Sequence, residues 1–114
     1  MSSRVWQTRI QDILDAIQAI TAQTAGMSFD DFAQQDTLVK AVLYDFIVIG
    51  EAAANIPVEI QQQHPELPWR SMKDMRNVAA HEYFQEALQT LRRTLQQGLH
   101  VIVEPLQQLL TDES

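Results

Sequence analysis

The chain has 114 residues, of which 46% are hydrophobic, with a formal net charge of −7 and no cysteine. This length fits one domain, residues 1–114, and the hydrophobic content is typical of a globular protein. The charge argues against a broad nucleic-acid-binding surface, which would be basic, but it allows a small local phosphate site. The lack of cysteine excludes disulfides and thiolate zinc sites. No apolar run approaches the roughly 20 residues of a membrane span, so we expect a soluble, cytoplasmic domain.

Apolar residues recur at helical spacing along nearly the whole chain, and no stretch alternates as a β-strand does. The first helix is predicted to start after Ser2 or Ser3 and to run to about Thr24, ahead of Gly26. A short helix is expected at residues 28–32, with the serine that opens this segment as its N-cap.

A second long helix is predicted to begin at the cap Asp36 and to end near Asn55, and it is apolar almost all round. An amphipathic helix on the surface of a small protein keeps one polar face. A helix this apolar must be covered on several sides, and a chain this short has few helices to cover it. We therefore expect it to form the centre of the bundle and also to be buried in part by a second subunit, which predicts a homodimer.

Prolines divide the remaining sequence. Pro57 should begin a brief helix that stops before Pro65, and Pro68 should begin the next one. The last helix is predicted from about residue 86 or 88 to residue 110, with Pro105 as a kink or a break. The sequence thus predicts an all-α fold, a helical bundle of three long helices and one or two short ones.

The helix after Pro68 concentrates polar groups that suit phosphate chemistry. Asn77 and His81 are four residues apart and share one stripe, with Arg76 and Tyr83 on the adjacent stripe. A guanidinium binds a phosphate and neutralises charge in a transition state, and an imidazole moves protons near neutral pH. Together they could promote attack of an RNA 2′-hydroxyl on the adjacent phosphate without a metal. The spacing alone is weak evidence, and taken by itself it favours His81 as a helix-end histidine that satisfies a backbone carbonyl.

Glu51 is a candidate partner for this site. It continues a partly apolar stripe of the second long helix, and a buried carboxylate needs a partner, for which Arg76 is the natural choice. Gly50 and the alanines at 52–54 would permit close packing of the two helices. The alternative is that Glu51 lies near the helix end and reaches water.

Charge and histidine spacing give weaker indications. Arg70, Lys73 and Arg76 lie within seven residues of each other, a local excess on an acidic chain that a solvated helix face would also explain. His64 and His100 are not at metal-ligand spacing, so we predict no metal and no cofactor.

Three blocks of sequence stand out along the chain: YDFIVIGEAA at 44–53, LPW at 67–69 and MRNVAAHEYF at 75–84, preceded by the element SFxxF at 28–32. Together they resemble the HepT-like family of HEPN-domain proteins. Their order and spacing agree with the family over nearly the whole chain. These three blocks in register are far more specific than the Arg–His pair alone.

The resemblance implies an antiparallel helical bundle that dimerises, with the motif helices of both protomers lining one cleft. It implies a metal-independent endoribonuclease, the toxin of a type VII-like toxin–antitoxin pair, with Arg76 and His81 as catalytic residues. Asn77 accompanies them, and Glu51 matches the acidic residue of the family's second helix. Tyr83 is implied as the residue to which the cognate partner, a minimal nucleotidyltransferase, attaches AMP to block the toxin.

The last helix departs from the family pattern. Arg92 and Arg93 stand where relatives often have a tryptophan, and the segment 98–100 replaces a turn toward consecutive prolines. These changes concern the partner contact or the oligomer packing rather than the cleft. An alternative function remains open, a non-catalytic nucleotide- or RNA-binding subunit of a nucleotidyltransferase, and RNA cleavage by the purified protein would distinguish the two.

Overall fold

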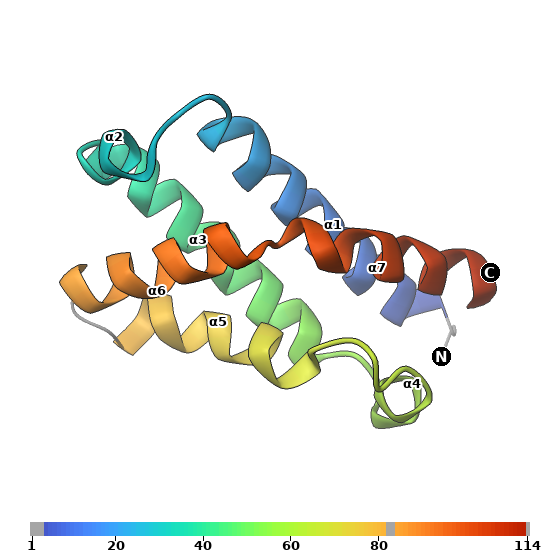
Figure 1. Cartoon of the computed structure of the whole chain (residues 1–114). Coiled ribbons are helices and arrows are strands. Elements are labelled where there is room, and N and C mark those ends of the chain that lie inside the picture. Colours follow the sequence, from blue (N-terminus) through green and yellow to red (C-terminus); the bar gives the residue numbers. More distant parts are fainter. Residues whose placement is uncertain (1–3, 82–83, 114) are drawn as a thin grey trace.

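The computed structural model describes residues 4–81 and 84–113 and is all-α over this part of the chain (Figure 1). Side chains are described for residues 5–80 and 85–112. The helices are α1 (Arg4–Thr24), α2 (Phe29–Ala33), α3 (Asp36–Ala54), α4 (Val58–Gln63), α5 (Trp69–His81), α6 (Phe84–Gln97) and α7 (His100–Glu113). The predicted helical class is confirmed, and no helix within these residues is both long and apolar enough to cross a membrane.

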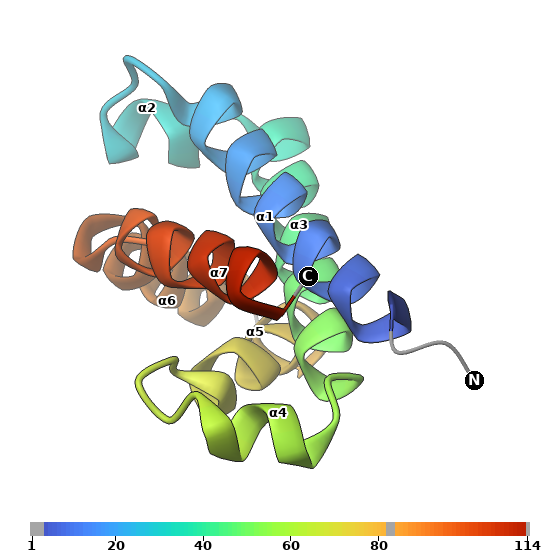
Figure 2. The same ribbon diagram turned by 90° about the vertical axis from the view of Figure 1, so that its right-hand side faces the viewer.

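Helix α3 lies in the middle of the bundle. It packs against α1 on one side and against α5 on the other, and the three helices alternate in direction (Figure 1). Helices α6 and α7 follow one another across one face of this layer, where α6 contacts α5 and α7 contacts α1 (Figures 1 and 2). The central place of α3 explains why its sequence is apolar on several sides, as predicted.

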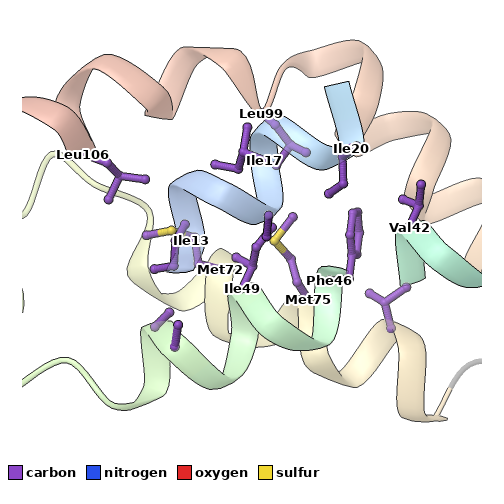
Figure 3. Close-up of a cluster of buried hydrophobic side chains, with 14 of the residues drawn as sticks. Ile13, Ile17, Ile20, Val42, Phe46, Ile49, Met72, Met75, Leu99 and Leu106 are labelled. Carbon is purple, nitrogen blue, oxygen red and sulfur yellow. The ribbon is translucent and has the colours of Figure 1, made fainter. Parts of the chain in front are cut away.

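Apolar side chains of most of the helices meet in the core, part of which Figure 3 shows. Their three- and four-residue spacing on each helix directs them to one face, where burial stabilises the fold. The labelled members are Ile13, Ile17 and Ile20 of α1, Val42, Phe46 and Ile49 of α3, Met72 and Met75 of α5, and Leu99 and Leu106 on the α7 side. The helical period in the sequence therefore identified the core correctly.

The ends of the first helices follow local chemistry. Gly26 takes a φ of 74° just after α1, and the Ser28 hydroxyl accepts a hydrogen bond of 3.1 Å from the backbone N–H of Asp31 at the start of α2. Both predictions are confirmed. The prediction that Asp36 caps α3 is wrong, because Asp36 is the first helical residue and Gln35 occupies the cap position. A carboxylate in the first turn is still favoured there by the helix dipole.

The predicted last helix is in fact two helices, and Pro105 does not separate them. The break is at Gly98, which adopts a φ of 103° that other residues rarely take. The Gly98 N–H completes α6 by donating to the Thr94 carbonyl at 3.0 Å, and the Gly98 carbonyl accepts from Val101 at 3.2 Å as α7 begins. Pro105 lies inside α7. Proline weakens a helix by removing one N–H donor, whereas Gly98 allows the backbone to turn.

Candidate active site

Helices α3 and α5 approach each other very closely where Gly50 faces Arg76. A Cβ atom placed on Gly50 would lie 2.6 Å from both the Cβ and the backbone nitrogen of Arg76. Non-bonded heavy atoms do not approach to this distance, so only glycine fits here. The prediction that Gly50 permits close packing is confirmed, and the contact sets where the Arg76 backbone lies relative to α3.

Arg76 is also held by the residue next to Gly50. Its Nη1 donates a hydrogen bond of 3.0 Å to Oε1 of Glu51, so the predicted pair is formed. The expectation that Glu51 points into apolar surroundings is wrong, because its side chain is 53% exposed and that of Arg76 is 42% exposed. The Glu51 carboxylate therefore reaches both water and Arg76.

The ion pair of Arg76 with Glu51 is partly exposed to water, which limits its contribution to stability. An ion pair in contact with water contributes only about 0–1 kcal/mol to stability, so its main effect is to orient the Arg76 side chain. A guanidinium carries five N–H donors, and the hydrogen bond to Glu51 engages one of them. Arg76 is therefore positioned and remains able to bind an anion from solvent.

The other residues of the predicted site lie along α5 and after it. Asn77 is exposed on α5, and Ala80 is also exposed, so this face of the helix is open to a ligand. His81 is the last residue of α5, one turn after Asn77, but its side chain lies outside the described residues. Tyr83 lies wholly outside them. The roles of His81 and Tyr83 thus stay predictions.

Next to Glu51, the outer side of α3 carries a shallow depression that α1 also borders. Tyr44, Ile47 and Val48 line it on α3, with Arg9 and Asp12 on α1. The Tyr44 side chain is 64% exposed. A large aromatic residue beside polar groups is a common feature of surfaces that bind a partner.

Arg92, one of the residues that depart from the family pattern, is used within the fold. Its guanidinium lies 3.7 Å from an Asp30 oxygen and 5.0 Å from the centre of the Phe29 ring. Arg92 thus connects α6 to α2 rather than facing the site. Among the described side chains, no group of three histidines, aspartates or glutamates could hold a metal ion.

The contact between Gly50 and Arg76 was not predicted from the sequence. Gly50 was expected to permit close packing, but its partner was not identified. The available signal was a glycine in the middle of a strongly apolar helix, where glycine costs about 1 kcal/mol relative to alanine and needs a packing reason.

Comparisons with known proteins identify the family. The model of the family described as "Ribonuclease HepT-like" matches residues 13–109, which include Gly50, Glu51 and the polar residues of α5. The chain is 36% identical over 90 residues to the "Probable ribonuclease HepT" of Thermococcus cleftensis, covering 79% of this chain and 82% of that protein. It is 27% identical over 104 residues to a protein named as an RNase from Caldanaerobacter subterraneus subsp. tengcongensis, covering 91% and 93%. No solved structure matches the chain significantly. The chain therefore belongs to the HepT-like ribonuclease family.

Proposed function

We propose that this chain is an endoribonuclease that cleaves RNA without a metal and acts as the toxin of a type VII-like toxin–antitoxin pair. The observation that carries the proposal is the partly exposed Arg76, which Glu51 orients within the region matched by the ribonuclease family. A positioned guanidinium on an otherwise acidic chain suits an anionic substrate.

In the proposed reaction, Arg76 binds the scissile phosphate and neutralises the charge that develops on it. His81 takes the proton of the adjacent 2′-hydroxyl, whose oxygen attacks phosphorus, or gives a proton to the departing 5′-oxygen. The products are a 2′,3′-cyclic phosphate and a 5′-hydroxyl. Asn77 positions the substrate or His81, and Glu51 acts through Arg76 as a positioning residue.

A homodimer is part of this proposal. The depression beside Glu51 leaves Tyr44 largely exposed and Ile47 and Val48 half-buried, on the helix whose sequence is apolar almost all round. A second copy related by twofold symmetry would cover these side chains and bring two Arg76 residues toward one cleft. Light scattering should give the mass of a dimer, and Tyr44→Glu should give a monomer with impaired cleavage. Cleavage by a monomeric parent protein would contradict this arrangement.

Tyr83 is the proposed point of control. A cognate minimal nucleotidyltransferase would join AMP to its phenol oxygen, which attacks the α-phosphorus of ATP as pyrophosphate leaves. The added phosphate brings negative charge near Arg76 and the adenosine adds bulk, so substrate is excluded. Incubation with that enzyme and ATP should add one AMP to the parent protein and none to Tyr83→Phe, as measured by mass spectrometry.

The decisive experiment is cleavage of total cellular RNA and tRNA in EDTA by protein whose Tyr83 is shown by mass spectrometry to be unmodified. Arg76→Ala and His81→Ala should each reduce cleavage by about 100-fold or more, because each removes a group used in the transition state. Arg93→Ala removes an exposed arginine of α6 and should cleave like the parent. Circular dichroism should show equal helicity in all proteins.

Either of two results would contradict the proposal. Cleavage by Arg76→Ala and His81→Ala at the parent's rate would place the chemistry elsewhere. No cleavage by a folded, unmodified, dimeric parent would instead favour the non-catalytic subunit of a nucleotidyltransferase.

A further inference from the structure

Helix α5 is basic although the chain as a whole is acidic. It contains three of the eight Lys and Arg residues but only one of the fifteen Asp and Glu residues, Asp74. The three cations are Arg70, Lys73 and Arg76, spaced three residues apart. Each step rises about 4.5 Å along the helix and turns by about 60°, so the cations wind from Arg76 toward the start of α5.

This basic stripe, defined as Arg70, Lys73 and Arg76, lies on the open side of α5. Trp69, Met72 and Met75 carry the other side of the helix into the core. Arg70 is exposed and Lys73 is half-buried, and α5 lies at the edge of the bundle (Figure 1). A half-buried lysine packs its methylene stem on the protein and keeps its ammonium group in water.

The two cations beyond Arg76 have no evident role within the fold. The ion pairs among the described side chains are Arg9–Asp12, His64–Glu66, Arg76–Glu51 and Arg92–Asp30, and neither Arg70 nor Lys73 takes part in them. Of the three cations in the stripe, only Arg76 is used in an ion pair there. The charges of Arg70 and Lys73 are thus available to an anionic ligand.

We propose that Lys73 and Arg70 bind successive phosphates of the single-stranded RNA that extends from the scissile phosphate at Arg76. The substrate strand then runs along the outer face of α5 toward its N-terminal end. This inference rests on the proposed ribonuclease function, and it adds the path of the substrate. The stripe contains no exposed aromatic residue on which bases could stack, so it contacts the backbone and contributes affinity without base preference.

The acidic remainder of the chain strengthens the argument for this path. With a net charge of −7, the chain as a whole repels a polyanion, so a strand is favoured where cations cluster. A strand that leaves Arg76 along α5 meets Lys73 and then Arg70, whereas Arg92 is engaged with Asp30 on another helix.

The test measures binding of a labelled single-stranded RNA to proteins that all carry His81→Ala, so that the RNA is not cut. Lys73→Ala and Arg70→Ala should each weaken binding several-fold. Each phosphate contact contributes about 0.7 to the slope of log K against log salt for single strands, so the double variant should lower that slope by about 1.4. In the cleaving parent, the same double substitution should raise KM and leave kcat almost unchanged.

Arg93→Ala is the matched control, since it removes an exposed arginine from α6. It should leave both the affinity and the salt slope near those of the reference protein. An unchanged slope in the double variant, or an equal loss in Arg93→Ala, would overturn the inference. Because binding is measured apart from cleavage, the two proposals can fail separately. A protein that binds RNA through the stripe but does not cut it would refute the ribonuclease function alone.

Discussion

Two glycines shape this molecule in different ways. Gly50 lies within α3 and does not interrupt the helix. Its role is steric, because the lack of a side chain lets Arg76 of α5 approach closely. Gly98 ends α6, because the turn into α7 requires a φ of 103°, and the His100 ring fills the space where a side chain would begin. The first glycine positions the candidate site and the second directs the outer helices. Gly50 is therefore required for steric space and Gly98 for backbone conformation, and substitutions can test each requirement separately.

The largest effect is expected from Gly50→Ala. The new Cβ meets backbone atoms of Arg76, which cannot rotate away, so the helices must separate. Overpacking of this kind costs up to about 3 kcal/mol, and the better helix propensity of alanine returns about 1, leaving a net loss near 2 kcal/mol. A displacement of Arg76 by about 1 Å can also lower RNA cleavage about 100-fold. Denaturant unfolding and cleavage assays measure the two effects.

Lys40 supplies the control for helix propensity in the same helix, because it is exposed on α3. The difference between Lys40→Ala and Lys40→Gly should be about 1 kcal/mol in favour of alanine. If Gly50→Ala also proved more stable than the parent and cut RNA normally, the close contact with Arg76 would not matter to the site.

The second effect, smaller and of a different kind, is expected from Gly98→Ala. Alanine at a positive φ costs about 1–2 kcal/mol, and its Cβ also collides with the imidazole of His100. Adding His100→Ala should recover the steric part and leave the conformational part. Cleavage per folded molecule should change far less than in Gly50→Ala. Additive losses in the double variant would show that the ring contact has no influence.

This pair of glycines also shows how far the sequence could predict the structure. The extents of α1 and α3 and the cap at Ser28 followed from apolar spacing and local hydrogen bonding, which the sequence contains directly. A kink or a break in the last helix was predicted at Pro105, because proline disfavours helix interiors. The break lies instead at Gly98, where a φ of 103° allows the backbone to turn.

The candidate site was predictable to a similar degree. The pairing of Glu51 with Arg76 was predicted because a buried carboxylate needs a partner, and the pair is formed although the carboxylate is exposed. The exposure of Glu51 was not predictable, because the position of a residue on one helix does not reveal which other helices cover it. The meeting of Gly50 with Arg76 is likewise a contact between distant segments, which no local pattern specifies.

Pro105→Ala separates the two helix-disfavouring residues further. Proline in a helix interior costs about 3 kcal/mol relative to alanine. Two effects offset much of this cost: proline restricts the conformations of the unfolded chain, and the half-buried ring of Pro105 packs within the fold. We expect a gain of about 1 kcal/mol, opposite in sign to Gly98→Ala. Thermal unfolding measures it. A loss of stability would mean that Pro105 shapes α7, as the sequence had suggested.

The smallest effect concerns Asp45, a half-buried carboxylate on the helix that contains Gly50. Burial raises the pKa of Asp45 above its ordinary value of 3.8, so the folded state binds this proton more tightly than the unfolded state. The stability that this tighter proton binding provides is complete below the ordinary pKa and is lost as the pH rises through the raised pKa of the folded state.

At neutral pH the charged form of Asp45 therefore destabilises α3. Asparagine has the same shape as aspartate but no charge, so the Asp45→Asn variant should be slightly more stable than the parent at pH 7. Denaturant unfolding measures this difference in stability. The difference should shrink to zero as the pH falls toward the ordinary pKa of Asp45. A constant difference at every pH would mean that the asparagine acts through packing rather than through the loss of a buried charge.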